Sequence, residues 1–252
     1  MSTRVIVNGA MGKMGKIAVE AINKHRDFEL VASLSRADDL QDSIIHAGAE
    51  IVIELTNAHC VYTNALTIIN NGAHPVIGAS GLLPAQIQHL IDLCNKKTLG
   101  GIIAPNFSIA AILMMNFAAM AARFLSEVEI VEIHHQQKLD APSATAMKTA
   151  EMISASRGVQ KHKLILEELL TGARGATHYD VNIHSLRLPG VVARQDVIFG
   201  GSGETLSISH NSIDRSAFMP GIILACESVQ KLDQMHYGLE YLLGLGVATK
   251  GA

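Results

Sequence analysis

The sequence is poor in cysteine and in charged residues. Its only cysteines, Cys60, Cys94 and Cys226, lie too far apart to form a metal-ligand spacing. An odd and scattered set indicates reduced thiols, so we expect a cytoplasmic protein with no metal. Only 17% of the residues are charged, the net charge is -3, and Lys and Arg form no run. Because duplex DNA binding needs clustered basic residues, we expect no nucleic-acid partner.

Long hydrophobic runs are also missing. The longest apolar helix candidate covers residues 109–122, contains Asn116 and is too short to cross a bilayer. No leader pattern precedes the first apolar strand at residues 5–7, so we expect neither a targeting segment nor a membrane partner. The chain is nevertheless 48% hydrophobic over 252 residues, which is typical of a folded soluble protein with one large domain or two small ones.

The first hundred residues alternate short apolar strands with helices. Strands are predicted at residues 4–8, 29–34, 51–55, 75–77 and 101–104, and helices at 16–24, 58–71 and 84–95. This alternation is typical of parallel βαβ units, whose right-handed crossovers build a Rossmann-type doubly wound sheet in an α/β domain. Ligands bind such a sheet beyond the carboxyl ends of its strands, so we expect a binding site there.

A glycine-rich turn follows the first strand at that position. Residues 9–15 read G-A-M-G-K-M-G, so Ala10 replaces the first glycine of the usual dinucleotide fingerprint. Gly12 still lets the backbone approach a phosphate, and Gly15 still allows close packing of helix on strand. The turn therefore predicts a dinucleotide site. The alternative interpretation is a tight turn that binds nothing.

The end of the second strand indicates which dinucleotide is preferred. NAD-specific sites usually carry Asp or Glu there, whereas this chain has Ser35 and Arg36. An arginine can clamp a 2′-phosphate through paired donors, and Lys13 adds a second positive charge in the glycine turn. We therefore expect NADPH to be preferred over NADH, unless Arg36 is an ordinary solvated residue. Asp38 and Asp39 are set aside because they lie beyond the expected strand end.

The alternation of strands and helices stops after Asn106. A helix at 109–125 leads to a strand at 128–134 and a helix at 144–156; strands at 180–188, 191–199 and 205–209 and a helix at 220–232 follow. This order predicts an α+β domain, with an antiparallel or mixed sheet that has helices on one face. We assign residues 1–105 and 215–252 to a dinucleotide-binding domain and residues 106–214 to a substrate-binding domain.

Chemically active side chains gather in residues 134–145, H-H-Q-Q-K-L-D-A-P-S-A-T. His134 can carry a proton near neutral pH, and Lys138 can bind a carboxylate or release a proton. A helix that begins near Ser143 adds free backbone N–H groups for an anion. Together they indicate a site that holds and protonates an acidic small molecule. Taken singly, each also has an ordinary interpretation as a strand-end histidine, a loop charge or a helix cap, and no Cys, Asp or Glu completes a zinc spacing.

The same segment resembles the signature of the 4-hydroxy-tetrahydrodipicolinate reductase family (also called dihydrodipicolinate reductase), which is close to H-H-x-x-K-x-D-A-P-S-G-T. Further family motifs are matched in order by V-x-G-A-x-G-K-M-G at 7–15, G-A-S-G at 78–81, A-P-N-F-S at 104–108 and S-L-R-x-x-G-x-V at 185–192. The resemblance extends over essentially the whole chain, and its first block is highly specific.

The resemblance implies an oxidoreductase that converts 4-hydroxy-tetrahydrodipicolinate, a ring with two carboxylates, to tetrahydrodipicolinate in the diaminopimelate route to lysine. It also implies NADPH or NADH as cofactor and a homotetramer joined through the second domain. His134 is then the general acid and Lys138 a second proton donor. The implied substrate contacts are His135, Ser143, Ala144 and Thr145. The implied cofactor contacts are Gly9, Ala10, Met11, Gly12, Lys13, Met14, Ser35, Arg36, Gly78, Ala79, Ser80, Ala104, Pro105, Asn106 and Phe107.

Some positions depart from the family pattern. Ala144 and Ala110 replace glycines, Glu54 stands where Asp is usual, and Ser35 replaces the acidic residue of some members. Two other classes stay open. One is a regulator that binds the nucleotide without chemistry and needs no proton donor. The other is a different small-acid dehydrogenase, although a semialdehyde dehydrogenase needs a thiol nucleophile for which the cysteines offer no recognisable context.

Overall fold

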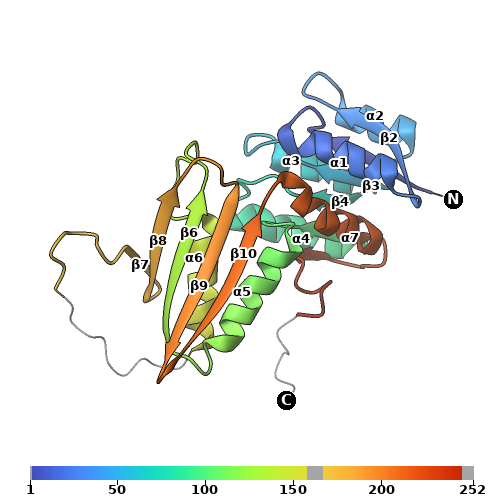
Figure 1. Cartoon of the computed structure of the whole chain (residues 1–252). Helices are drawn as coiled ribbons and strands as arrows, with labels where there is room; N and C mark the ends of the chain where they lie inside the picture. The colour runs from blue at the N-terminus through green and yellow to red at the C-terminus, as the bar shows by residue number, and fades with distance from the viewer. Residues whose placement is uncertain (1, 158–166, 246–252) are drawn as a thin grey trace, which may run out of the picture. The chain divides into compact units, whose positions relative to one another are not determined.

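The structure is a computed structural model that describes residues 2–157 and 167–245. The chain divides into two compact units, Met1–Ile109 with Arg215–Ala252, and Ala110–Asp214 (Figure 1). Residues 158–166 and 246–252, which the expected domains include, lie outside the described residues. Within the described parts of the chain, every helix is too short or too polar to span a membrane.

The first unit is built on a six-stranded parallel sheet with the strand order β11-β5-β4-β3-β1-β2. Its strands are β1 Thr3–Asn8, β2 Phe28–Leu34, β3 Ile51–Glu54, β4 His74–Ile77, β5 Gly101–Ile103 and β11 Met235–Tyr237. The chain runs outward from β1 in both directions, to β2 on one side and to β3 on the other. A crevice beyond the carboxyl ends of β1 and β3 is therefore the expected ligand position.

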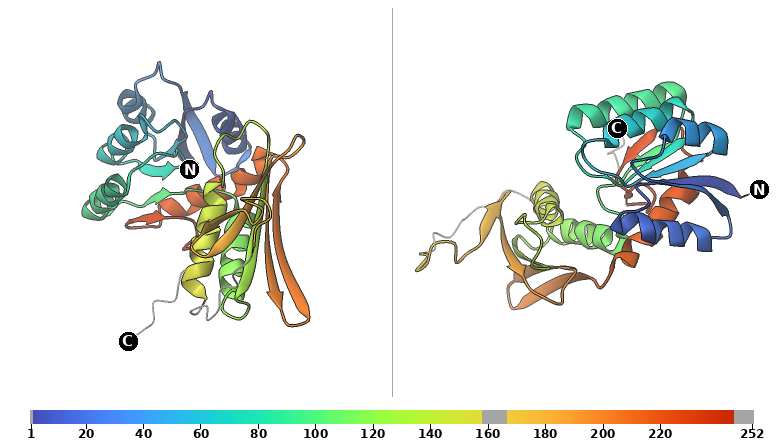
Figure 2. Two further views of the ribbon diagram at one scale, coloured as in Figure 1. Left: turned by 90° about the vertical axis from the view of Figure 1, so that its left-hand side faces the viewer. Right: turned by 90° about the horizontal axis from the view of Figure 1, so that it is seen from above.

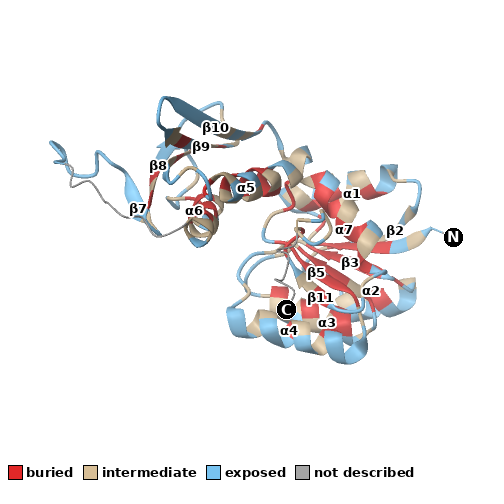
Figure 3. Ribbon diagram, turned by 90° about the horizontal axis from the view of Figure 1, so that it is seen from below, coloured by how far each residue is buried: buried red, intermediate tan, exposed pale blue. Residues whose placement is uncertain are grey.

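Helices cover both faces of this sheet. α1 (Lys13–Lys24) and α7 (Met219–Val229) pack on one face, and α2 (Leu40–Ala47), α3 (Val61–Asn70) and α4 (Pro84–Lys97) on the other (Figure 3). The buried residues of α1 are Gly15, Ala18 and Ile22, which recur at helical spacing on one side. Strand β3 is buried at all of its positions, as expected when helices cover both faces. The doubly wound Rossmann-type fold predicted from the sequence is confirmed.

Three elements of this unit were not predicted: α2, β11 and a short 3₁₀ helix, η1 (Arg215–Phe218). α2 begins after Asp39, whose side chain accepts a hydrogen bond from the Asp42 N–H, and it ends at Gly48 in the left-handed conformation. β11 adds a sixth strand of only three residues, which pair with β5. Three residues are too few to show an alternating pattern in the sequence. This strand forms because it pairs with β5.

The second unit contains a five-stranded mixed sheet with the order β10-β9-β6-β8-β7. Its strands are β6 Glu127–His134, β7 Ala176–His178, β8 Val181–Arg187, β9 Ala193–Gly201 and β10 Glu204–Ser212. β6 pairs in parallel with β8, which places the carboxyl ends of these two strands side by side. α5 (Ile109–Ala121) and α6 (Ala144–Ser156) lie on one face, as the right-hand view of Figure 2 shows. The predicted α+β architecture is confirmed.

Alternation along β6 separates the two faces of this sheet. Ile130 and Glu132 are buried on the face under the helices, whereas Val131 on the other face is only partly buried. Leu186 and Ile198 lie on that second face by register and are 37% and 40% exposed. The second face is thus partly apolar and solvent-accessible in this chain.

Candidate functional site

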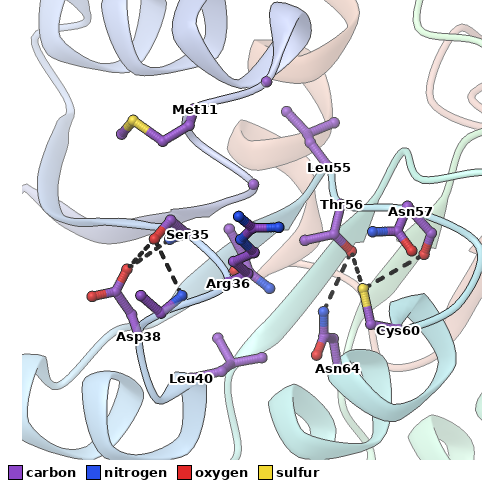
Figure 4. Close-up of a pocket in the computed structure, with 14 residues that line it drawn as sticks. Met11, Ser35, Arg36, Asp38, Leu40, Leu55, Thr56, Asn57, Cys60 and Asn64 are labelled. Atoms are coloured by element: carbon purple, nitrogen blue, oxygen red, sulfur yellow. Dashed lines mark hydrogen bonds between the residues drawn. The ribbon is translucent and has the colours of Figure 1, made fainter.

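A cavity of about 620 Å³ lies beyond the carboxyl ends of β1, β2 and β3 in the first unit (Figure 4). Its walls come from the segments that follow these strands, so it occupies the crevice expected from the strand order. The predicted cofactor residues that line it are Gly9, Met11, Gly12, Ser35 and Arg36.

Close backbone packing shapes the turn between β1 and α1. Gly9 has a φ of 88°, and a Cβ there would lie 2.7 Å from the carbonyl oxygen of Leu55. A Cβ at Gly15 would lie 2.1 Å from the carbonyl oxygen of Gly9, so both positions require glycine. Gly12 is the N-cap of α1 and has no side chain to occupy the first N–H groups of the helix. An anion can therefore bind at this helix start.

The wall at the end of β2 carries the residues predicted to select the cofactor. The Ser35 backbone N–H and hydroxyl both donate to the Asp38 carboxylate, at 2.8 and 2.9 Å. The backbone hydrogen bond, followed by that from the hydroxyl, holds the pKa of Asp38 below its usual range. The turn thus folds Asp38 back against Ser35 and into the cavity wall (Figure 4). The distance of Asp38 from the end of β2 is therefore not a reason to exclude it from the cofactor site. The cavity wall carries both a cation, Arg36, and an anion, Asp38.

The buried carboxylate of Glu54 bonds to side chains that line another part of the cavity wall. Glu54, the last residue of β3, is fully buried and accepts hydrogen bonds from Asn8 Nδ2 at 2.6 Å, Asn64 Nδ2 at 3.1 Å and the Thr56 N–H at 3.0 Å. Burial raises the pKa of Glu54, although these hydrogen bonds act in the opposite direction. Asn8, Thr56 and Asn64 all line the cavity, so Glu54 orients their side chains from behind.

The other predicted cofactor residues lie outside this cavity, at the same edge of the sheet. Ala10, Lys13 and Met14 belong to the glycine turn and the first turn of α1; Gly78, Ala79 and Ser80 follow β4, and Ala104, Pro105, Asn106 and Phe107 follow β5. These last two loops are closely packed, because a Cβ at Gly78 would lie 2.4 Å from the Phe107 ring. Gly9 and Gly12 at the cavity wall, the uncapped start of α1 and Arg36 together fit a pyridine dinucleotide.

His134 and Lys138 lie at the end of β6 in the second unit. His134 is the last residue of the strand, is 17% exposed, and has its Nδ1 2.5 Å from Oε2 of Glu132. Lys138 follows in a turn, where its N–H donates to the carbonyl oxygen of His135 at 3.1 Å. The Lys138 ammonium contacts the carboxylate of Asp140 at 2.6 Å. A proton carrier and a cation therefore share one short connection.

The charges around His134 act on its pKa in both directions. Burial has the largest effect and lowers the pKa; the hydrogen bond and charge of Glu132 raise it, and the charges of Lys138 and Arg187 lower it. The net result is a pKa below the ordinary value. Burial raises the pKa of Glu132, but hydrogen bonds from Arg187, Ser185 and His134 outweigh this and leave it below its usual value. Glu132 is therefore ionised near neutral pH.

The start of α6 presents hydrogen-bond donors after this loop. Ser143 is the N-cap, and its hydroxyl accepts from the Ala146 N–H at 3.1 Å. Among the described residues, no acceptor is found for the N–H groups of Ala144 or Thr145, and the buried Nδ1 of His135 also has no partner. The substrate residues predicted from the sequence are thus polar groups that a ligand could satisfy.

Two charged residues that organise this cluster were not predicted as site residues. Arg187, the last residue of β8, donates to the Glu132 carboxylate at 3.0 and 3.1 Å. In the sequence there were only weak signs that these two residues belong to the site. Glu132 lies two positions before His134 and hence on the same face of the strand. Arg187 appeared only as one position of the S-L-R-x-x-G-x-V match. The register that pairs His134 with Arg187 across β6 and β8 brings them together.

Two of the three cysteines, Cys94 and Cys226, are poorly suited to nucleophilic catalysis. Burial raises the pKa of Cys94 to about 12 and also raises that of the fully buried Cys226. Cys60 Sγ donates to Thr56 Oγ1 at 3.2 Å. Across residues 2–157 and 167–245, no group of three His, Cys, Asp or Glu side chains could hold a metal ion. The buried Cys94 and Cys226 are therefore unsuitable as the thiol nucleophile that a semialdehyde dehydrogenase needs.

Comparison with known proteins decides the family. Residues 3–107 match the family model for the dihydrodipicolinate reductase N-terminus, and residues 110–243 match that for its C-terminus. The chain belongs to the dihydrodipicolinate reductase family. Relatives of this reductase include the 4-hydroxy-tetrahydrodipicolinate reductases of Legionella pneumophila (strain Lens), 63% identical, and Coxiella burnetii (strain Dugway 5J108-111), 48% identical; both alignments cover 96% of this chain and 100% of the relative.

A solved structure extends the comparison to three dimensions. Dipicolinate-bound dihydrodipicolinate reductase from Paenisporosarcina sp. TG-14 matches with a TM-score of 0.89 and 38% identity, over 96% of this chain and 99% of that chain. The family, the fold class and the reductase function expected from the sequence are therefore confirmed, as is an oxidoreductase acting on a CH–CH group with NAD(P)H. The domain boundaries and the roles of individual residues stay predictions.

Proposed function

We propose that this dihydrodipicolinate reductase acts on the conjugated imine that 4-hydroxy-tetrahydrodipicolinate forms by losing water, and that the product enters the diaminopimelate route to lysine. The observation that carries the proposal is the cluster at the end of β6. There His134 is held 2.5 Å from Glu132, next to Lys138 and the capped start of α6. In this proposal residues 1–105 and 215–252 bind the cofactor, and residues 106–214 bind the substrate.

The cofactor is a nicotinamide dinucleotide, for which we propose NADPH as the preferred form and NADH as the second. The pyrophosphate is assigned to the glycine turn and the first N–H groups of α1. Arg36 offers paired donors to a 2′-phosphate, whereas the charge of Asp38 opposes it, so the preference reflects a balance between the two. When bound, the cofactor supplies a hydride to the ring.

The ring substrate carries two carboxylates, and the second unit offers donors for both. We assign one carboxylate to the N–H groups of Ala144 and Thr145, at a helix start that Ser143 caps. Lys138 and His135 are assigned to the second. Because Lys138 contacts Asp140, substrate binding exchanges one carboxylate partner of this lysine for another. The relative from Paenisporosarcina was solved with dipicolinate bound, and dipicolinate is a ring diacid, which supports this assignment.

We assign the protonation of the ring to His134. Addition of hydride to the conjugated imine leaves an enamine, and the neighbouring carbon must then gain a proton. The imidazolium of His134 donates that proton, which contributes about 10² to 10⁴-fold to the rate as general acid catalysis. Lys138 acts as the second proton donor, and its positive charge favours the electron-rich ring beside it.

We also propose a homotetramer and a cytoplasmic location. The solvent-accessible face of the five-stranded sheet carries the apolar Leu186 and Ile198, which a second copy of the chain could cover. Light scattering should then give a mass about four times 26.9 kDa. The free thiols of Cys60, Cys94 and Cys226 are in keeping with a reducing compartment.

The test follows nicotinamide absorbance with freshly made cyclic substrate and either NADPH or NADH. The native protein should oxidise NADPH rapidly, and His134→Gln should lower kcat about 10² to 10⁴-fold with a much smaller change in KM. His184→Gln is the matched control. His184 also lies in a strand of this sheet and bonds a glutamate, Glu129 at 2.7 Å, but on the other face. This variant should keep its activity if it elutes with the native mass.

The outcomes separate the parts of the proposal. If neither cofactor is consumed although both bind, the reductase function fails and the nucleotide-binding regulator gains support. A clear preference for NADH would overturn the interpretation of Ser35 and Arg36 but leave the enzyme assignment in place. An equal loss of activity in His184→Gln would remove the argument that His134 has a specific role.

A further inference from the structure

Glu132 is a carboxylate with no exposure to solvent, at the centre of the proposed site. A buried charge is costly unless it is paired and hydrogen-bonded. Glu132 meets this condition through two hydrogen bonds from Arg187, at 3.0 and 3.1 Å, and a contact of 2.5 Å with Nδ1 of His134. Each of its oxygens accepts from Arg187, and one also faces His134. Ser185 also donates a hydrogen bond to Glu132, so the carboxylate is fully engaged by Arg187, His134 and Ser185.

We propose that Glu132 is a positioning residue that selects the ring tautomer of His134, and that Arg187 couples it to the loop bearing Lys138. The inference rests on the proposed function and adds the residues that control its proton donor. A carboxylate is an acceptor only, so the imidazole nitrogen facing it must donate. Nδ1 therefore keeps its hydrogen in both protonation states of His134. The proton that can be transferred is then confined to Nε2, away from Glu132.

The second effect of Glu132 is electrostatic. Its negative charge favours the imidazolium form, against burial and against the positive charges of Lys138 in the loop and Arg187 in β8. The residue paired with His134 in β9, Ala193, carries no charge. Without Glu132, the remaining influences all disfavour a charged imidazole. His134 would then be protonated only at lower pH.

Arg187 connects Glu132 to the loop that carries Lys138. Its Nη2 donates to the carbonyl oxygen of Asp140 at 2.7 Å, and its Nε donates to that of Lys138 at 3.3 Å. The same guanidinium that pairs with Glu132 thus holds the backbone from which the Lys138 side chain projects. One buried carboxylate therefore fixes both the proton donor and, through Arg187, the neighbouring cation.

The opposite face of β6 provides a matched control. Glu129 also contacts a histidine, His184 at 2.7 Å, and an arginine, Arg174. Because side chains alternate along a strand, Glu129 points away from the face that carries Glu132 and His134. Glu129→Gln therefore removes the same kind of charge from the same strand without touching the proposed site.

The experiment compares Glu132→Gln, Glu132→Asp and Glu129→Gln with the native enzyme. For Glu132→Gln we expect kcat to fall at least about tenfold, and the pH at which kcat/KM declines on the alkaline side to move down by about one to three units. Affinity for dipicolinate, measured by titration, should fall by a smaller factor than kcat, because Arg187 keeps its own hydrogen bonds to the carbonyl oxygens of Lys138 and Asp140. Glu132→Asp keeps the charge and should restore most of the native position of the pH profile. Glu129→Gln should resemble the native enzyme if it elutes with the native mass, since Glu129 is paired with Ile198 on the face that we assign to the tetramer interface.

A lower kcat with an unmoved pH profile would overturn the proposal, because loss of structure alone reduces activity without changing the pKa of His134. Nitrogen-15 NMR of the native protein is a readout that needs neither turnover nor a folded variant. It should find neutral His134 with its hydrogen on Nδ1, and a hydrogen on Nε2 would overturn the inference. If the native protein shows the predicted tautomer but does not reduce the substrate, the proposed function fails while the positioning role stands.

Discussion

Replacing Gly15 by alanine should damage both the stability of the first unit and its affinity for the cofactor. The added Cβ would lie 2.1 Å from the carbonyl oxygen of Gly9 and 2.7 Å from Cα of Ala10. Both are backbone atoms, so no side-chain rotation can relieve the clash. To reach an ordinary contact of 3.4 Å, the turn and α1 must separate by about 1.3 Å, the difference between these distances.

The size of the effect follows from that displacement. Overpacking of this kind typically costs about 1–3 kcal/mol, which urea denaturation should detect as a lower midpoint. The same shift moves the first N–H groups of α1 away from a bound pyrophosphate. Each hydrogen bond to a charged group contributes about 1.5–3 kcal/mol, so losing one weakens NADPH binding by about 10- to 100-fold. Fluorescence titration of NADPH would measure this loss.

Gly12→Ala is the control that separates binding from stability. Gly12 has φ −72° and ψ 169°, a conformation open to alanine, and its Cβ would lie 3.3 Å from the Gly9 carbonyl oxygen. It should reduce stability by less than about 1 kcal/mol. Because Gly12 lines the cavity, its methyl group should still hinder the cofactor. Native stability and native NADPH affinity in Gly15→Ala would refute this account of the turn.

Three further predictions concern the cap, the cofactor preference and pH. Ser143→Ala removes the cap of α6 and should lower stability by about 1 kcal/mol in urea denaturation, with weaker dipicolinate binding by titration. Arg36→Ala should lower the NADPH-to-NADH ratio of kcat/KM about tenfold, whereas Asp38→Asn should raise it; a shift of both ratios in one direction would contradict the assignment. Because His134 must be protonated to act and its pKa is lowered, kcat/KM should decline as pH rises through a value below about 6.5, the ordinary histidine pKa. The decline of kcat should lie at higher pH, since the two substrate carboxylates favour the imidazolium; coincident profiles would count against this.

Local patterns in the sequence were enough to predict much of the first unit. The strand that ends at Asn8, the glycine turn and the helix after it follow from short-range periodicity and from the backbone freedom of glycine. α2 was missed although Asp39 and Gly48, residue types typical of helix caps, mark its two ends. β11 could not have been found locally, because only pairing with β5 makes its three residues a strand.

By itself, then, the sequence determined the family, most of the elements of both units and the segment that carries the candidate residues His134 and Lys138, since these depend on residue type and spacing. Only the tertiary structure decided which charges act on the predicted site residues. Asp38 reaches Ser35 because a turn reverses the chain, and Arg187 reaches Glu132 because β8 pairs with β6 in one register. Such contacts join positions far apart in sequence or on opposite sides of a turn, and a buried carboxylate such as Glu132 is stable only once those partners have been brought to it.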